Sequence, residues 1–432
     1  MAKLWNKSGQ VLHPLVEKYT AGTDHVFDHQ LMPFDIDASA VHAKALKKAD
    51  VLTASELKKI LAALAALQKK FDQGKIKTTS ADEDCHTVIE NYLIKQLGDI
   101  GKKIHTGRSR NDQVLVATRL YMKHHLGMLQ EKALALASSL VDVADKYKEI
   151  PMPGYSHTQQ AMLSTVGHYM ASYAESLIDD ADFALKVLQH LDKNPLGSAA
   201  GFGTSIGIDR SITTKELGFG SIQINSLYCQ NSRGKFESAY MEALAQIMLT
   251  LGKFANDLLI FTSQEFDFFS VDESVTTGSS IMPHKRNLDA MEILRGNVSV
   301  VIANQLMVKD IAKNLISGYN RDGQLIKKPL FESTQIALDS IEIVALVLKG
   351  LNPKTERIRA KINPGIFTAD VANELVKKGM PFRDAYKKAA TMIPLATDLE
   401  KNIASKKSVG APGNLQLKQY RERIKQAQKK NT

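Results

Sequence analysis

Apolar residues recur at three- and four-residue spacing over most of the chain, which is the pattern of amphipathic α-helices. A first clear helix is expected from Thr53, where Thr53 and Glu56 can form a capping box, to near Gly74. Long helices in series pack together, so the pattern predicts a mainly α fold built as a long-helix bundle. Five longer segments with this spacing follow, over residues 112–147, 158–191, 235–263, 287–309 and 326–351.

Segments rich in Gly, Ser, Pro and Asn separate these helices, and no convincing alternating apolar run predicts an extended sheet. Two Asn-Pro pairs between residues 352 and 364 interrupt the helical pattern, and a short basic helical part follows. We therefore expect three domains. These are a mainly helical N-terminal domain over 1–104, a central long-helix bundle over 105–352 and a small helical C-terminal domain over 353–432.

The amino-acid composition is that of a soluble globular protein. With 432 residues, 44% of them hydrophobic and 24% charged, the chain has the balance of a large globular protein. Its only cysteines, Cys85 and Cys229, form neither a disulfide framework nor a CxxC pair, which favours a reducing cytosol. The first ten residues lack an apolar signal core, and the longest apolar run, 60–67, is far shorter than the ~20 residues that span a bilayer. We expect a soluble, cytoplasmic protein with no membrane partner.

The net charge of +10 would attract anions, either nucleic acid or a substrate with several carboxylates. The lysines are scattered singly, aromatic residues are 6% of the chain, and no nucleic-acid-binding pattern is present. A small carboxylated substrate is therefore favoured over nucleic acid. His25 and His29 share helical spacing, but neither an HExxH motif nor a cysteine partner accompanies them, so no metal site is expected.

The segment 277–287, TGSSIMPHKRN, has the composition of a catalytic loop. Gly278 is expected to turn the backbone where a side chain would clash, and neighbouring N–H groups can face an anion. Ser279 is a poor base at its free pKa, so it needs stabilising neighbours such as Lys285 and Arg286. An isolated GSS triplet would favour a solvated Gly/Ser turn, and it is the rest of the motif that favours a catalytic loop.

Two polar segments precede helices in the first third of the chain. In DEDCH, Asp84 and His86 offer an acceptor and a donor to a substrate, although capping of the helix that begins near Thr87 explains the acidic residues as well. In HTGRSRNDQV, arginines flank Ser109, and Asn111 opens a long helix. Guanidinium groups converging on a helix N-terminus suit a carboxylate; the alternative is a basic turn with an Asn cap.

Three further segments are polar and lie between long helices. GYSHTQQ places Ser156, His157 and Gln159 at an expected helix start, where the histidine is either a general acid or base or merely structural. The glycine-rich segment 195–210 lacks a Walker A ending and is interpreted as a close helix crossing, with Asp209 and Arg210 as an ion pair. The last segment contributes Tyr319, Asn320, Arg321 and Gln324.

In their order and distances these segments resemble the fumarase/aspartase superfamily, whose signature is GSSxMPxKxN. Within it, HTGRSRNDQV, the PLGS segment and DEDCH before a helix resemble the argininosuccinate lyases, over about residues 27–412. The resemblance implies a homotetramer with a twenty-helix core, in which each active site collects loops from three subunits. It also implies reversible anti elimination of argininosuccinate to L-arginine and fumarate, the last step of arginine biosynthesis, without a cofactor.

The resemblance also assigns roles by motif position. Ser279 is the implied base, Lys285 and the loop N–H groups stabilise its alkoxide and the dianion, and Asn287 binds a carboxylate. His157 is the implied acid or proton relay, with Glu292 orienting it and Ser156 beside it. The remaining positions bind substrate or line its pocket: Ser109, Arg110 and Asn111 for the fumarate half; Ser39, Asp84, Arg233, Tyr319, Arg321 and Gln324 for the arginine half; and His86 and Gln159 close to the site.

The chain departs from the family pattern at several of these positions. Ser156 replaces a threonine, and residues 160–163 lose an arginine, a glutamine and a proline, which is expected to reshape the helix start. Arg321 replaces a lysine, and a guanidinium fork is not equivalent to a point charge. Ser232 and Gly234 replace both acidic residues around Arg233, making this segment less acidic towards a cationic arm.

Two other hypotheses follow from these observations. The departures would also suit a related carbon–nitrogen lyase that acts on a different N-substituted aspartate. The fold would also suit a non-catalytic, crystallin-like structural protein, although such a protein has no physical need for Ser279, Lys285, His157 and Asn111.

Overall fold

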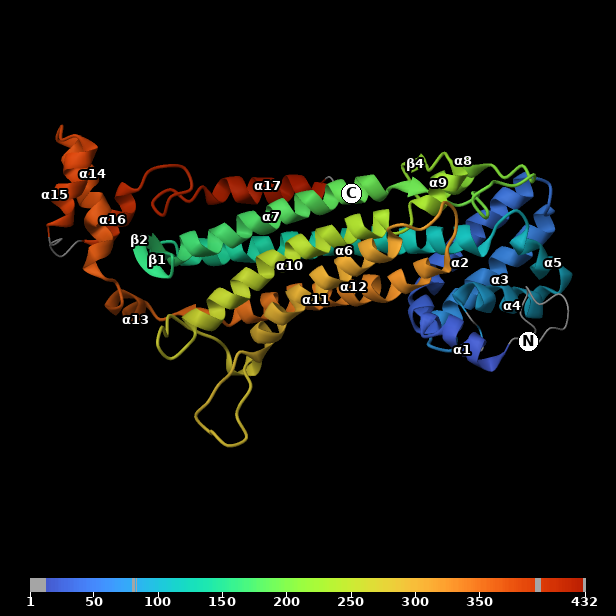
Figure 1. The fold of residues 1–432 in the computed structure, drawn as a ribbon, viewed down its shortest axis with the longest axis horizontal. Helices are drawn as coiled ribbons and strands as arrows, with labels where there is room; N and C mark the ends of the chain where they lie inside the picture. The colour runs from blue at the N-terminus through green and yellow to red at the C-terminus, as the bar shows by residue number, and fades with distance from the viewer. Residues whose placement is uncertain (1–12, 80–81, 83, 393–397, 430–432) are drawn as a thin grey trace. The chain divides into compact units, whose positions relative to one another are not determined.

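The computed structural model describes residues 13–79, 82, 84–392 and 398–429 (Figure 1). Residues 1–12, which include the segment examined for a signal core, and Glu83 of the DEDCH motif lie outside the described residues. The chain divides into two compact units. Unit 1 comprises residues 1–126, 186–242 and 303–334, and unit 2 comprises residues 127–185, 243–302 and 335–432.

The fold is mainly α, as the apolar periodicity predicts. All five predicted long helices are present, and four of them begin within two residues of the predicted position. The exception is α7, which begins at Val166 and not at Thr158. These helices are α6 (Arg110–Lys146), α7 (Val166–Leu191), α10 (Lys235–Phe261), α11 (Asp289–Ala312) and α12 (Lys327–Lys349).

Unit 1 holds a helical layer at the N-terminal part of the chain. The helix α2 (Asp24–Lys48) packs against α3 (Ala54–Asp72), α4 (Cys85–Leu97) and α8 (Arg210–Glu216). The Thr53 side chain accepts from the Glu56 N–H while the Glu56 carboxylate accepts from the Thr53 N–H, so the predicted capping box is confirmed. The other short elements of this unit are α1 (Pro14–Ala21), α5 (Asp99–Lys102), η1 (Lys103–His105), α9 (Ser226–Asn231) and η3 (Arg321–Ile326).

Side-chain contacts join the long helices within unit 2. Ser176 of α7 bonds Thr250 of α10 at 3.0 Å, and Lys132 of α6 pairs with Glu342 of α12 at 2.7 Å. The side chain of Arg421 in α17 pairs with Asp142 of α6. The other helices of this unit are η2 (Glu273–Val275), α13 (Thr355–Ala360), η4 (Pro364–Phe367), α14 (Thr368–Lys377), α15 (Phe382–Ala390), α16 (Leu399–Ser405) and α17 (Leu417–Lys429).

One described segment, Ser226–Phe261, is long and apolar enough to span a membrane by length and composition alone. Its apolar window is 56% buried, and along α10 the residues Tyr240, Leu244, Leu251 and Leu258 are all at most 1% exposed. This spacing is that of a core helix, whose apolar face packs against neighbouring helices.

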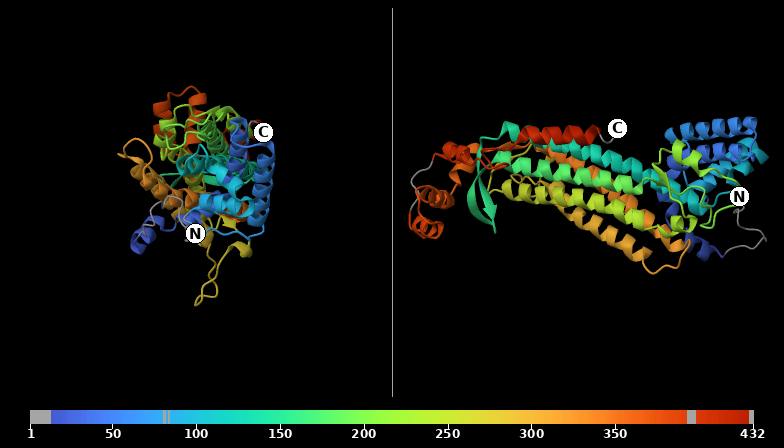
Figure 2. Two further views of the ribbon diagram at one scale, coloured as in Figure 1. Left: turned by 90° about the vertical axis from the view of Figure 1, so that its right-hand side faces the viewer. Right: turned by 90° about the horizontal axis from the view of Figure 1, so that it is seen from above.

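Within the described residues, three two-stranded sheets accompany the helices, and the sequence pattern did not predict them. The longest is an antiparallel hairpin of β1 (Pro151–Ser156) and β2 (Gln159–Thr165), in which Ser156 pairs with Gln159. In the right-hand view of Figure 2 the hairpin lies at one end of α7, and it packs against α13, η4 and α16. The two short sheets pair β3 (Lys193–Asn194) with β4 (Ser221–Ile222) in parallel, and β5 (Phe269–Ser270) with β6 (Asn352–Pro353) antiparallel.

The predicted ion pair of Asp209 and Arg210 is wrong. Asp209 instead caps α8, where its carboxylate accepts from the Ser211 N–H at 2.9 Å. The Arg210 guanidinium donates to backbone carbonyl oxygens, among them those of Leu196 and Asn194. Arg210 therefore ties the glycine-rich segment to its surroundings through the backbone, because these carbonyl groups need donors once they leave water.

Candidate active site

Asp84 serves two functions at the start of α4. Its Oδ1 accepts from the backbone N–H of Thr87 at 2.7 Å and from the Thr87 hydroxyl at 2.6 Å, which confirms the capping interpretation. Its Oδ2 accepts from Arg110 at 3.1 Å. Burial opposes ionisation, but His86, Arg110 and the Thr87 bonds outweigh it and lower the pKa of Asp84. A carboxylate at a helix start is thus held ionised beside a guanidinium.

His86 is buried beside a second carboxylate. Its Nδ1 lies 2.7 Å from Asp35 Oδ2, while Nε2 has no protein partner among the described residues. Burial alone would lower the pKa of His86, but the neighbouring Asp35 and Asp84 raise it above its usual value. Because Asp35 takes up Nδ1, the orientation of the ring is fixed, and Nε2 is the nitrogen left for a ligand.

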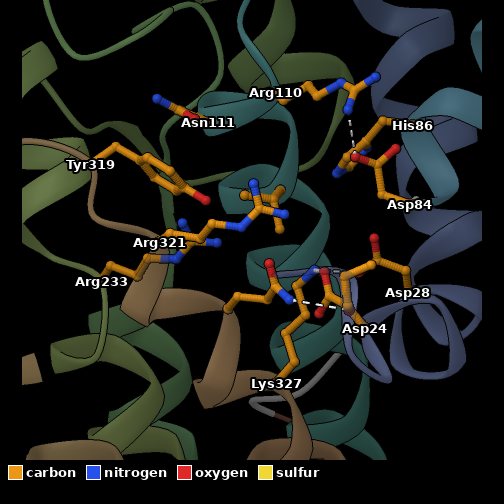
Figure 3. Close-up of a pocket in the computed structure, with 13 residues that line it drawn as sticks. Asp24, Asp28, Asp84, His86, Arg110, Asn111, Arg233, Tyr319, Arg321 and Lys327 are labelled. Carbon is orange, nitrogen blue, oxygen red and sulfur yellow. Dashed lines mark hydrogen bonds and ion pairs between the residues drawn. The ribbon is translucent and has the colours of Figure 1, made fainter. Parts of the chain in front are cut away.

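Asp84, His86 and Arg110 line a cavity of about 220 Å³ that lies wholly within unit 1 (Figure 3). Its walls come from α2, α4, α6, α12 and the segment at residues 319–324, which are far apart in the sequence. Eight of the residues singled out in the sequence analysis meet here: Asp84, His86, Arg110, Asn111, Arg233, Tyr319, Arg321 and Gln324.

One wall of the cavity is cationic and aromatic. The Arg233 guanidinium lies 5.2 Å from the centroid of the Tyr319 ring, a cation–π contact. Gly323 lies directly behind this side chain: a Cβ there would lie 2.7 Å from Arg233 Cδ, so a larger residue would displace the Arg233 side chain. The side chains of Arg321 and Gln324 both donate to the Thr20 carbonyl oxygen, at 3.1 and 3.0 Å. These hydrogen bonds fix the orientation of the Arg321 and Gln324 side chains in this wall.

The opposite side of the cavity carries charged residues that no sequence motif predicted. Lys327 at the start of α12 pairs with Asp24 at 2.8 Å and with Asp28. Burial raises the pKa of Asp24 to about 6, and the two carboxylates raise that of Lys327 despite its burial. The four-residue spacing of the two aspartates puts them on one helix face. That spacing was a usable signal, but nothing in the sequence pointed to Lys327.

Among the described residues, Asp28, Cys85 and His86 form one cluster of potential metal ligands, within 4.8 Å of one another. The Lys327 ammonium contacts Asp28, and burial raises the pKa of the Cys85 thiol. A metal would need a thiolate and free carboxylate oxygens. The donor set therefore fits a metal ion poorly, because its acidic charge is already matched by a cation of the chain.

The two arginines around Ser109 do not converge on one place as expected. Arg110 lines the cavity, whereas the Arg108 side chain is buried and donates to Ser39 Oγ at 2.9 Å. Ser109 Oγ accepts from the Asn111 N–H, which makes it part of the start of α6. Ser39 and Ser109 are thus not among the residues that line the cavity.

The expected helix start at Ser156 and His157 is wrong, because these residues form the tip of the β1–β2 hairpin in unit 2. His157 and Thr158 occupy its two-residue turn with φ values of 51° and 61°. Turns of this kind require positive φ at both central residues. Ser156, His157 and Gln159 are all exposed in the chain, and Gln159 and the turn residue Thr158 line a second cavity beside the tip of the hairpin.

The loop 277–287 lies between α10 and α11, also in unit 2, and projects as the yellow loop of Figure 1. Thr277 and Asn287 close its base through two backbone hydrogen bonds of 2.9 Å. Ser279 Oγ accepts from the N–H groups of Ile281 and Met282, at 3.4 and 3.2 Å. The loop thus surrounds the serine oxygen with donors, which is the arrangement that stabilises an oxyanion.

The loop 277–287 and the first turn of α11 are open to solvent at three predicted positions. The explanation given for Gly278 is wrong: a Cβ there would meet open space, and its φ is not in the left-handed region. Lys285 is exposed within the loop. Glu292 is exposed in the first turn of α11.

Packing explains the loss of acidic residues around Arg233. Ser232 is fully buried, and its hydroxyl donates to the Cys229 carbonyl oxygen and accepts from the Gln223 amide. Gly234 has a φ of 82°, and a Cβ on it would lie 2.4 Å from the Ala312 Cβ of α11. In this chain a side chain at position 234 would overlap Ala312, and an acidic residue at position 232 would lose the hydrogen bond that the buried serine donates.

Gly234→Asp is therefore expected to lower the free energy of unfolding by about 2–5 kcal/mol, through strained backbone and overpacking. Urea denaturation measures this loss. Gly203→Asp is the matched control, because Gly203 has a φ of 75° but open space around a Cβ. Equal denaturation midpoints for the two variants would contradict the role given to the close approach of Ala312.

The sequence of the chain is similar to known proteins over most of its length. Residues 13–303 match the family described as Lyase. The chain is 41% identical to the argininosuccinate lyase of Thermotoga neapolitana, over 90% of this chain and 97% of that protein. It is 40% identical to the argininosuccinate lyase of Stenotrophomonas maltophilia, over 97% and 98% of the two chains.

Solved structures share the fold at lower sequence identity. An EDDS lyase in complex with formate superposes with a TM-score of 0.79 at 20% identity, over 98% of this chain and 91% of that one. A fumarate lyase:delta crystallin from Brucella melitensis bound to cobalt superposes with a TM-score of 0.72 at 20% identity, over 93% and 91%. These likenesses concern the fold alone.

Proposed function

The chain belongs to the lyase family, and from this premise we propose that it is an argininosuccinate lyase, which converts argininosuccinate reversibly to L-arginine and fumarate. The elimination is anti, and it is the last step of arginine biosynthesis and a reaction of the urea cycle. The observation that carries the proposal is the cavity of unit 1, which sets cationic groups against carboxylates as a substrate with carboxylates and a cationic arm requires.

The two sides of the cavity suit the two halves of that substrate. Arg110 and Asn111 stand at the start of α6, where a guanidinium fork, an amide and a helix N-terminus favour a carboxylate. Arg233 and Tyr319 form the facing wall. Asp24, Asp28 and Asp84 supply negative charge for the cationic arm, with Lys327 beside them. Ser39 and Ser109 hold Arg108 and the start of α6 in place.

Ser279 is the proposed base. It takes a proton from the carbon next to a carboxylate of the succinyl group, and the electron pair is delocalised into that carboxylate as a dianion. The N–H groups of Ile281 and Met282 already point at its Oγ, which lowers the cost of an alkoxide. Lys285 adds positive charge to the same loop, and Asn287 binds a carboxylate of the substrate.

His157 is the proposed acid. As the carbon–nitrogen bond breaks and the double bond of fumarate forms, the departing guanidinium nitrogen takes a proton from His157, directly or through Ser156. Glu292 orients the imidazole. Gln159 and His86 complete the surroundings of the substrate. Near neutral pH a histidine can both give and take this proton, as a reversible reaction requires.

The catalytic residues and the cavity belong to different compact units, and we propose that a homotetramer brings them together. The apolar surface of α11 supports this. Ile293, Val300 and Met307 recur every seven residues and are 65%, 38% and 39% exposed. A row of this kind is typical of a helix that packs against another helix. In the proposed tetramer the long helices form a twenty-helix core, and each site takes loops from three subunits.

We propose that the chain has three domains, over 1–104, 105–352 and 353–432, and acts in the cytoplasm on a small molecule. Neither a membrane nor a nucleic acid is among the proposed partners. The +10 net charge then serves to attract a substrate that carries several carboxylates.

Ultraviolet absorbance of fumarate tests the activity directly. Purified protein mixed with argininosuccinate is expected to give a steady rise in absorbance. The second candidate, a lyase for another N-substituted aspartate, is motivated by Arg321 and by the absence of acidic residues at Ser232 and Gly234 on either side of Arg233. Turnover of such an adduct with no signal from argininosuccinate would replace the first proposal with the second. No turnover of either by a folded tetramer would leave the crystallin-like alternative.

A further inference from the structure

The position of His157 depends on how the β1–β2 hairpin is held. The imidazole stands at a two-residue turn whose central residues, His157 and Thr158, both have positive φ. This backbone conformation is unfavourable for side chains other than glycine, so surrounding contacts must maintain it. The tip itself is exposed, and the anchors therefore lie further along β2.

Two anchors fix β2 to the C-terminal part of unit 2. Leu163, 1% exposed, packs in an apolar cluster with Ile366, Phe367 and Ile403. This cluster fixes the base of the hairpin, at a residue six positions along the chain from His157. Apolar contacts are not directional, so Leu163 holds the strand in the core without setting the orientation of its tip.

Gln160 is the anchor nearest to the tip. Its Nε2 donates to the Lys361 carbonyl oxygen at 2.7 Å, and its Oε1 accepts from the Asn363 N–H at 2.9 Å. Both partners are backbone groups of the segment between α13 and η4. Asn363 is itself fixed, because its side chain caps η4 by accepting from the Gly365 N–H at 2.8 Å. The amide of Gln160 thus makes one donated and one accepted hydrogen bond with the backbone of a segment that is itself held in place.

We propose that Gln160 is a positioning residue that clamps the hairpin onto the 361–363 segment and so sets where His157 stands. This inference rests on the proposed function, in which His157 is the acid. At neutral pH an amide of this length supplies both bonds, whereas arginine cannot accept from Asn363 and an ionised glutamate cannot donate to Lys361. The arginine that related sequences carry at this position would make one of the two bonds at most.

The test compares Gln160→Met, which keeps the length and loses both bonds, with Met162→Ala, an exposed change on the same strand. Gln160→Met is expected to lower kcat by roughly 10- to 100-fold with KM within about 3-fold, because a shift of about 1 Å in a catalytic group has effects of this size. Hydrogen exchange of the amides in 151–165 is expected to speed up in Gln160→Met alone.

Gln160→Glu adds a readout that a purely structural residue would not affect. A protonated carboxyl reproduces the donor and acceptor of the amide, whereas an ionised one cannot donate. The ratio of its kcat to that of the wild type is therefore expected to rise as the pH falls from about 8 to about 5, towards the ordinary pKa of glutamate. The same ratio for Gln160→Met is expected to stay flat.

Two results would overturn the clamp: unchanged exchange in Gln160→Met, or a wild-type kcat in Gln160→Met while His157→Asn is inactive. The second result leaves the proposed function intact. A His157→Asn variant with wild-type turnover would instead remove the acid assignment, and the positioning role with it. Running His157→Asn beside the other variants therefore separates failure of the clamp from failure of the proposed function.

Discussion

Ser279→Ala is expected to lower the turnover of argininosuccinate by at least about 10³-fold, within the range found when a positioned proton-transfer group is removed. The substitution deletes the one oxygen towards which the Ile281 and Met282 N–H groups point. KM is expected to change little, because the cavity that binds the substrate lies in unit 1 and is left untouched. Fumarate absorbance under saturating substrate measures the loss.

The matched control is Ser274→Ala, which removes an exposed hydroxyl just before the loop 277–287 and is expected to keep wild-type turnover. Lys285→Met tests the stabilisation separately. It is expected to cost less than Ser279→Ala, because the two N–H groups remain. A Ser279→Ala variant within a few-fold of the wild-type rate would show that another group removes the proton.

The helices of this fold could be predicted because their apolar residues repeat over many turns, as along α10. The start of α7 could not. Met162, Leu163, Val166 and Met170 fit helical spacing, yet the first two lie on β2. The turn that makes the hairpin uses His157 and Thr158 at positive φ, where glycine or asparagine would have been the usual sequence signal.

The site could be predicted in part, for a different physical reason. Asp84 and Arg110 could be predicted as site residues because each belongs to a recognisable sequence motif, and both line the cavity. Asp24 and Lys327 could not be predicted as site residues, because their ion pair joins segments about 300 residues apart and no local sequence pattern indicates such a contact. Arg108 and Arg110 look equivalent in the sequence. Their roles differ in the structure because the Arg108 side chain donates a hydrogen bond to Ser39, a buried residue of α2, whereas Arg110 lines the cavity.

Mixing two inactive variants, Ser279→Ala and His157→Asn, is expected to restore activity from near zero. If Ser279 and His157 of one site come from different subunits, random exchange in a tetramer leaves both intact in about one site in four, so the mixture should reach roughly a quarter of the wild-type rate. The expectation follows from the proposed tetramer, in which no subunit supplies a whole site. Subunit exchange by brief dilution in mild denaturant, followed by the fumarate assay, measures it.

The control for this experiment pairs Ser279→Ala with Lys285→Met. Both changes lie in the loop 277–287, so a subunit that carries either one always delivers a damaged loop. No subunit in their mixture carries an unmutated loop. The turnover rate of the mixture is therefore not expected to exceed the rate of Lys285→Met alone. Mass spectrometry of differently tagged subunits verifies that exchange has taken place. Verified exchange without recovery in the first mixture would mean that Ser279 and His157 act from the same subunit, and the exposed apolar row on α11 would then have to serve an assembly that leaves each active site whole.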